Sequence, residues 1–177
     1  MRDRPHGWRW DGRDRPPFAV APRVRQESVW DYPRPPRIVS DQREVIVCAG
    51  DVEIARTSRA LRVLETASPP TFYLPRDDVR TAHLVRAGGT SWCEWKGAAT
   101  YWDVTYDGAR LERAAWSYES PSPPFAAITG HLSFYPARLA CFVDGVRVRP
   151  QPGGFYGGWV TPEIVGPYKG DPGTGGW

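Results

Sequence analysis

Glycine and proline punctuate this chain from end to end. Its 177 residues include 18 glycines and 19 prolines, and both residue types interrupt helices and mark turns. The chain also carries 9 tryptophans, 8 tyrosines and 6 phenylalanines, which is more aromatic surface than a disordered protein leaves in water. The pattern therefore predicts one loop-rich domain whose core is built from short β-strands.

Residues 1–36 are predicted to form an extended arm. Prolines recur through this segment, and proline removes the backbone donor that a helix or a central strand needs. Aromatic side chains could still anchor the arm by docking on the domain, most readily through residues 27–33. The candidate anchors are Trp8, Trp10, Phe18, Trp30 and Tyr32.

The positive charge of the chain is concentrated in the arm. The formal net charge is +3, but residues 1–25 hold seven arginines and three aspartates, a net +4, so residues 26–177 sum to −1. A nucleic-acid-binding domain needs a clustered basic face, so nucleic acid is not expected as a partner. The cations are 21 arginines against two lysines, which is typical of a GC-rich, bacterial-type genome and makes Lys96 and Lys169 unusual.

The cysteines and the apolar runs indicate a reducing compartment. Cys48, Cys93 and Cys141 are odd in number and widely spaced, which argues against a disulfide scaffold and against a zinc site built from cysteine pairs. The chain starts without an apolar signal core, and no run approaches the roughly 18 apolar residues of a membrane helix. We expect a cytoplasmic protein with no membrane partner.

Turn signals between apolar runs predict antiparallel hairpins. Asp107-Gly108 and Asp144-Gly145 suit type I′ turns, whose two central residues need positive φ, and Gly50-Asp51 separates two further apolar runs. Together with the runs at residues 60–65 and 71–74, these hairpins give roughly nine short strands. The fold class is therefore mainly β.

Two short helical segments are expected beside the strands. Asp77–Val85 begins with a capping aspartate and is followed by Gly88-Gly89. Residues 124–129 begin with proline and are followed by Gly130. The predicted organisation is the arm at residues 1–36, one domain of short antiparallel strands at residues 37–149, and a Gly/aromatic-rich C-terminal extension at residues 150–177.

The segment Trp92–Trp102 concentrates the unusual side chains. It is predicted to be part of a long strand broken at Gly97, in which Trp92, Glu94 and Lys96 share one face. Among indole rings, Lys96 could have a lowered pKa, because desolvation disfavours the ammonium, or it could hold an anionic ligand. The structural alternative is that Lys96 pairs with Glu94 or a carbonyl while its stem packs on tryptophan.

Cys93 is a candidate nucleophile within the same segment. Its thiolate would be stabilised by Lys96, and it would need a general base, for which His131 is the suitable histidine. The competing interpretation is a buried, inert cysteine. The other lysine, Lys169, lies in a Gly-rich tail and is expected to be exposed.

A series of motifs along the chain resembles a known family. The motifs are Ala60–Thr66, Pro69–Pro75, Cys93–Trp102, Ala115–Tyr118, Phe134-Tyr135 and Val143-Asp144-Gly145. In this order they resemble the domain-of-unknown-function family four-two-seven, which is also labelled nucleotidyltransferase-like. The resemblance covers roughly residues 37–149.

This resemblance implies a β-tent-like fold, related in architecture to methionine sulfoxide reductase B and to the ligand-binding domain of cereblon. The family label implies nucleotide and Mg²⁺ handling, and several β-tent proteins hold zinc through two cysteine pairs. This chain has neither such pairs nor a Gly-Ser turn feeding paired aspartates, so no cofactor and no metal is expected. By motif position, the candidate site residues are Glu65, Tyr73, Lys96, Tyr101, Trp116, Tyr118 and Tyr135.

The first functional hypothesis is a cytoplasmic small-molecule-binding domain. An aromatic-lined pocket would fix a polar or anionic group of an unknown small molecule through Lys96 and Glu65. The alternatives are an enzyme that uses Cys93 or Lys96 as nucleophile, and a protein-interaction module that acts through the N-terminal arm. The chain could also assemble as a homodimer.

Overall fold

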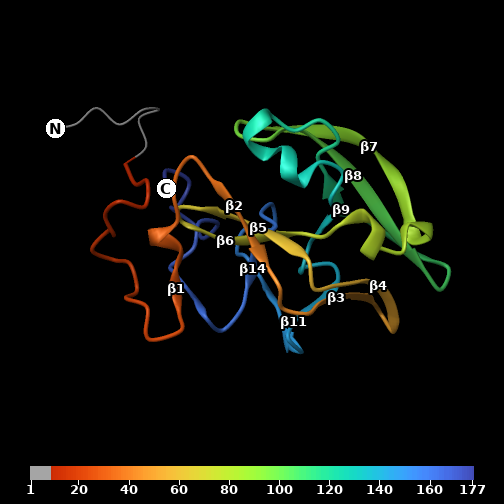
Figure 1. Ribbon diagram of the computed structural model, residues 1–177, viewed down its shortest axis with the longest axis horizontal. Coiled ribbons are helices and arrows are strands. Elements are labelled where there is room, and N and C mark those ends of the chain that lie inside the picture. Colours follow the sequence, from red (N-terminus) through yellow and green to blue (C-terminus); the bar gives the residue numbers. More distant parts are fainter. Residues whose placement is uncertain (1–8) are drawn as a thin grey trace.

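The computed structural model describes residues 9–177 of the chain. Within this range, short strands alternate with turns and 3₁₀ segments, and the strands form five sheets (Figure 1). All the strand pairs are antiparallel except one short parallel pair. The expected mainly β fold of short antiparallel strands is confirmed.

The longest strands form one antiparallel sheet in the order β10–β9–β8–β7. Its strands are β7 (Leu84–Cys93), β8 (Gly97–Tyr106), β9 (Ala109–Ser117) and β10 (Ser133–Phe134). Asp107 and Gly108 connect β8 to β9 with φ values of 47° and 77°, as the predicted type I′ turn requires. In Figure 1 this sheet lies on the side of the molecule opposite the arm and the C-terminus.

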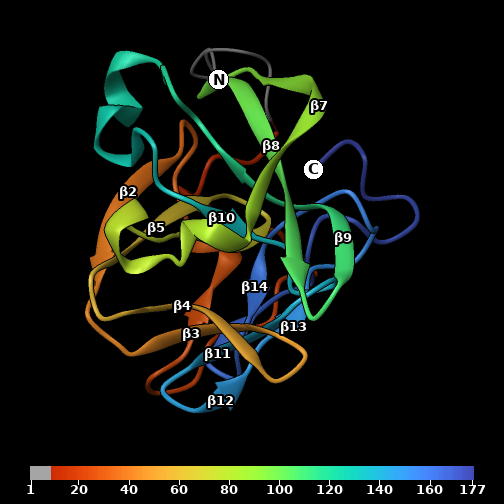
Figure 2. The same cartoon turned by 90° about the vertical axis from the view of Figure 1, so that its right-hand side faces the viewer.

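A second antiparallel sheet, in the order β12–β11–β3–β4, lies below the β7–β8 hairpin in Figure 2. Its strands are β3 (Val45–Ala49), β4 (Val52–Thr57), β11 (Ala140–Val143) and β12 (Val146–Arg147). Gly50-Asp51 connects β3 to β4, and Asp144-Gly145 connects β11 to β12. Both predicted hairpins are therefore confirmed.

The remaining strands form one three-stranded sheet and two short pairs. The three-stranded sheet has the order β2–β5–β6, and it lies between the other two sheets and the chain ends in Figure 1. Its strands are β2 (Arg37–Asp41), β5 (Ala60–Glu65) and β6 (Ser68–Tyr73). The pairs are β1 (Glu27–Ser28) with β15 (Ile164–Val165), which is parallel, and β13 (Arg149–Pro150) with β14 (Trp159–Val160).

The helix predicted at Asp77–Val85 is wrong. Two separate 3₁₀ turns occupy this segment, and Leu84 already begins β7. The backbone of Val79 bridges to Ala55, and the Arg80 N–H donates to the Ile54 carbonyl at 2.8 Å, so neighbouring strands take the groups that a helix would pair internally. The second expected segment is present as a 3₁₀ helix. The 3₁₀ elements are η2 (Val29–Asp31), η3 (Arg76–Asp78), η4 (Thr81–His83) and η5 (Pro123–Ile128).

The main core includes a side chain from the C-terminal extension. Trp159 is fully buried with Phe72, Leu132 and Phe134. Its indole ring stacks on Phe72 with a centroid distance of 4.7 Å, and its N–H donates to the Phe134 carbonyl at 3.0 Å. The extension is therefore packed into the domain.

The described part of the arm packs against the C-terminal residues. Trp30 is fully buried, and its indole N–H donates to the Pro167 carbonyl at 3.0 Å. Phe18 stacks on Trp177 with a centroid distance of 4.9 Å. The expected docking through residues 27–33 is thus present, while the candidate anchor Trp8 lies outside the described residues.

Candidate functional site

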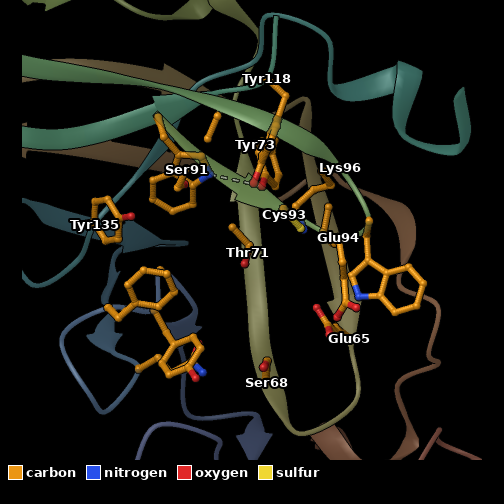
Figure 3. A pocket seen from close by; sticks show the side chains of 18 of the residues that line it. Glu65, Ser68, Thr71, Tyr73, Ser91, Cys93, Glu94, Lys96, Tyr118 and Tyr135 are labelled. Atoms are coloured by element: carbon orange, nitrogen blue, oxygen red, sulfur yellow. Dashed lines mark hydrogen bonds between the residues drawn. The ribbon is translucent and has the colours of Figure 1, made fainter. Parts of the chain in front are cut away.

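A cavity of about 310 Å³ lies between the β7–β9 strands, the β5–β6 strands and the C-terminal extension. The sequence hypothesis required Lys96 and Glu65 to face one aromatic-lined hollow, and both line this cavity (Figure 3). The structure also brings the other candidates to it. The candidate residues that line the cavity are Glu65, Tyr73, Lys96, Tyr101, Trp116, Tyr118 and Tyr135.

Strand geometry explains why these side chains converge. The lining residues of five neighbouring segments include a pair spaced two apart in each, and such residues lie on one face of a strand. In β8 and β9, Tyr101 is directly opposite Trp116, so both aromatic side chains reach the cavity from the same face. The five pairs are Val63 and Glu65, Thr71 and Tyr73, Ser91 and Cys93, Ala99 and Tyr101, and Trp116 and Tyr118.

The turn between β7 and β8 carries Lys96 into the cavity. Gly97 adopts a φ of 91° there, and the Ser122 N–H donates to the Lys96 carbonyl at 3.2 Å. The Ser122 hydroxyl donates to the Trp95 carbonyl, which fixes the turn further. The expectation of a strand that continues through Lys96 is wrong: β7 ends at Cys93 and β8 begins at Gly97, so the chain reverses here. Lys96 is 9% exposed and Trp92 is 78% exposed.

Lys96 carries its positive charge inside the cavity. Burial alone lowers the pKa of its ammonium, but interactions with Tyr73, Cys93 and Glu65 outweigh burial, and the pKa of Lys96 is raised. Its Nζ also lies 5.8 Å and 5.7 Å from the ring centroids of Tyr118 and Phe125, within cation–π range. The expectation of a lowered pKa for Lys96 is therefore wrong.

Two tyrosine hydroxyl groups accompany the ammonium. Burial raises the pKa of Tyr73 and of Tyr118, so both hydroxyls keep their protons at neutral pH. The Trp116 indole N–H donates to the Tyr73 hydroxyl oxygen at 3.4 Å. In Figure 3, Tyr73, Cys93 and Lys96 converge on one end of the cavity. This end thus offers an ammonium and protonated hydroxyls, which suit an anionic group.

An aromatic wall flanks this polar end. The Trp116 and Tyr135 rings lie 4.4 Å apart, centroid to centroid, at 44°. Tyr73 meets Trp116 edge-on at 6.3 Å, and the Tyr101 hydroxyl is hydrogen-bonded to Ser91 at 2.8 Å. Walls of this kind suit flat ligands. Tyr73 and Trp116 are also part of a hydrophobic cluster with Ile128 and Phe125, so they serve packing as well.

The other side of the cavity has mixed charge. Glu65 forms an ion pair with Arg34 at 3.5 Å, and Glu65 and Glu94 lie together on this side in Figure 3. Lys169 was expected to be exposed, which is wrong: it is half-buried, and its Nζ donates to the Trp177 carbonyl at 3.0 Å. Burial and the nearby Arg34 lower the pKa of Lys169.

Comparison with known proteins assigns most of the cavity lining to one family segment. A family model described as Domain of unknown function (DUF427), and labelled NTP_transf_9, matches residues 37–148, more than half of the chain. The chain belongs to this family. The match confirms the resemblance carried by the motifs, and every candidate site residue lies within the DUF427 segment. No protein with a curated description is detectably similar to the chain.

Cys93 lines the cavity, whereas the histidine proposed as its general base does not. His131 lies on the loop after η5, and its Nδ1 is 3.2 Å from the Thr129 carbonyl oxygen. The assignment of His131 as that base is therefore wrong. The Cys93 thiol itself interacts with the Lys96 ammonium and with the Tyr118 hydroxyl.

Among residues 9–177, no three His, Cys, Asp or Glu side chains are grouped so that they could hold a metal ion. The helical elements of the same range are all too short or too polar to cross a membrane.

One wall of the cavity follows the DUF427 segment and was not predicted from the sequence. Its residues are Gln151, Phe155, Tyr156 and Gly157. The signal in the sequence is an aromatic pair between two glycine pairs, at residues 153–158. Nothing in that pattern indicates which face of the domain the segment covers.

Proposed function

We propose that this DUF427 chain is a cytoplasmic binding domain for a small anionic molecule that carries a flat ring. The observation that carries the proposal is a buried, charged Lys96 at one end of an aromatic-lined cavity. The cavity volume of about 310 Å³ is at the small end of the range for ligand pockets. This size favours a metabolite over a large cofactor.

The charge balance around Lys96 supports an anionic ligand. Tyr73 and Tyr118 are protonated at neutral pH. Glu65 forms an ion pair with Arg34 at 3.5 Å, so its negative charge does not act on Lys96 alone. A buried ammonium is costly unless an opposite charge compensates it. An anion bound beside Lys96 would add to the compensation that its neighbours already give, in a region of low dielectric where the attraction is strong.

The Lys96→Met variant is expected to bind anions about tenfold to a hundredfold more weakly than the wild type, because a hydrogen bond to a charged group contributes about 1.5–3 kcal/mol. The probes are benzoate, indole-3-carboxylate, adenosine monophosphate and inorganic phosphate. Thermal unfolding measures the effect, since a probe at about 100 times its Kd stabilises the wild type by about 2.7 kcal/mol. For a chain of this size, that raises Tm by several degrees.

Lys169→Met is the matched control, because it removes the other lysine that lines the cavity and leaves Lys96 in place. This variant should keep most of the increase in Tm. The proposal is contradicted if no probe raises the Tm of the wild type. It is also contradicted if Lys96→Met retains the full increase.

A second candidate function is an enzyme that uses Cys93 as nucleophile. The observation that favours it is the contact of the Cys93 thiol with the Lys96 ammonium inside the cavity, because a neighbouring cation stabilises a thiolate. Cys141 offers an internal reference, since it is fully buried and burial raises its pKa.

Under native conditions at neutral pH, we expect iodoacetamide to alkylate Cys93 at least tenfold faster than Cys141, because Cys93 lines the cavity whereas Cys141 is fully buried. Peptide mass spectrometry measures both rates. Lys96→Met should slow the reaction of Cys93 several-fold and leave the rate of Cys141 unchanged. Alkylation of Cys93 only after unfolding would identify it as a structural cysteine and remove this candidate.

A further inference from the structure

One wall of the cavity comes from outside the segment that defines the family. The family match ends at residue 148, whereas Gln151, Phe155, Tyr156 and Gly157 all line the cavity. The site is thus built from two parts of the chain. One part is the DUF427 segment with Lys96, and the other is the loop of residues 151–158, which we call the selectivity wall.

Hydrogen bonds close the selectivity wall at its base. The Gln151 N–H donates to the Gly158 carbonyl at 3.1 Å, and the Gly158 N–H donates to the Gln151 side-chain oxygen at 3.2 Å. The Gln151 side-chain nitrogen also donates to the Lys169 carbonyl at 2.7 Å. These bonds hold the loop in a defined position over the cavity.

Gly157 places the wall directly against Trp116. A Cβ atom at Gly157 would lie 2.1 Å from Cη2 of the Trp116 ring, so only glycine permits this approach. Trp116 belongs to the DUF427 segment and faces the cavity. The wall is therefore fitted to the aromatic side of the site.

The wall presents an exposed phenyl ring at the cavity. Phe155 is 70% exposed and Trp92 is 78% exposed, and both line the cavity. Among the described residues, these are the two most exposed large aromatic side chains; the third, Phe18, is 46% exposed and stacks on Trp177 away from the cavity. Exposed apolar surface that gathers at one cavity is typical of a ligand-binding site.

We propose that the selectivity wall makes the site specific for aromatic carboxylic acids. Phe155 and Trp92 contact the ring of the ligand, and its carboxylate reaches Lys96; the inference rests on the proposed function of Lys96. A contact between two aromatic rings is more favourable than the burial of their apolar surface alone would give. A saturated acid of similar size gains the contact with Lys96 but lacks the ring–ring contact.

Calorimetric titration with benzoate and with cyclohexanecarboxylate tests this proposal. The wild type should bind benzoate about threefold to tenfold more tightly than the saturated acid, which is the range expected from aromatic pairing. Phe155→Ala and Phe155→Leu should both reduce the preference for benzoate, because each removes the phenyl ring and leaves the contact with Trp92. Val24→Ala is the control, since Val24 is 92% exposed and does not line the cavity.

The possible results separate this proposal from the proposed function. Suppose that Lys96→Met no longer binds either acid while Phe155→Ala keeps the preference of the wild type for benzoate. The proposal for the selectivity wall is then overturned, and the role of Lys96 stands. If the wild type binds inorganic phosphate but neither acid, and Lys96→Met does not bind phosphate, the proposal for the selectivity wall is likewise overturned. If Lys96→Met binds every probe as the wild type does, both proposals fail.

Discussion

Trp159→Ala is expected to lower the free energy of unfolding by about 3–5 kcal/mol, the usual cost of truncating a buried aromatic side chain to alanine. Trp159 is fully buried in the main core and stacks on Phe72 at 4.7 Å. Truncation leaves a cavity between sheets and removes the hydrogen bond to the Phe134 carbonyl. Equilibrium unfolding in urea, followed by tryptophan fluorescence and circular dichroism, measures the change.

Trp159→Phe separates the contribution of ring packing from that of the hydrogen bond. Phenylalanine keeps a ring against Phe72 but cannot donate to the Phe134 carbonyl, so we expect a smaller loss, of about 1–3 kcal/mol. A loss below about 1 kcal/mol for Trp159→Ala would contradict the packing described for the C-terminal extension. It would indicate that the DUF427 segment is stable without this side chain.

Trp30→Ala is the second variant with a large expected effect, again about 3–5 kcal/mol. Trp30 is fully buried, and its ring meets Phe18 and Trp177 with centroid distances of 5.1 Å in both cases. Its indole N–H also donates to the Pro167 carbonyl at 3.0 Å. The substitution therefore removes the centre of the contact between the arm and the C-terminal residues, and denaturant unfolding measures the loss.

Limited proteolysis adds a readout that is specific to this contact. In Trp30→Ala, cleavage within residues 9–25 should become faster than in the wild type, because the arm loses its main anchor. A Phe18→Ala control should show a smaller loss of stability, since Phe18 is 46% exposed. Wild-type protection of the arm in Trp30→Ala would contradict this account. The alternative that the arm recruits a partner stays a prediction.

The hairpins could be predicted because their signals are local. Asp107-Gly108 and Asp144-Gly145 need positive φ at both residues, and these four residues have it. The segment at residues 77–85 was mistaken for a helix because its capping aspartate and following glycines are equally local signals. Its outcome was decided by the strand that contains Ile54 and Ala55, which takes up its backbone groups, and sequence periodicity does not report such a contact.

In the candidate site, too, local signals could be predicted from the sequence and long-range contacts could not. The DUF427 motifs and the rarity of lysine singled out Lys96, and the alternation of strand residues accounts for Tyr101 and Trp116 at one cavity. The direction of Lys96 could not be predicted, because it depends on a chain reversal held by Ser122 from a distant loop. The selectivity wall could not be predicted either, because its position depends on the fit of Gly157 to Trp116.

The paired residues of the five cavity segments have a consequence for how this site can change. The ladder hydrogen bonds between neighbouring strands join backbone atoms, so a new side chain at position 71 or 99 alters the interior and leaves the ladder in place. Relatives with the same strand arrangement could thus accept chemically unrelated molecules. Knowing what one of them binds would not settle what another binds, and each lining set has to be interpreted residue by residue.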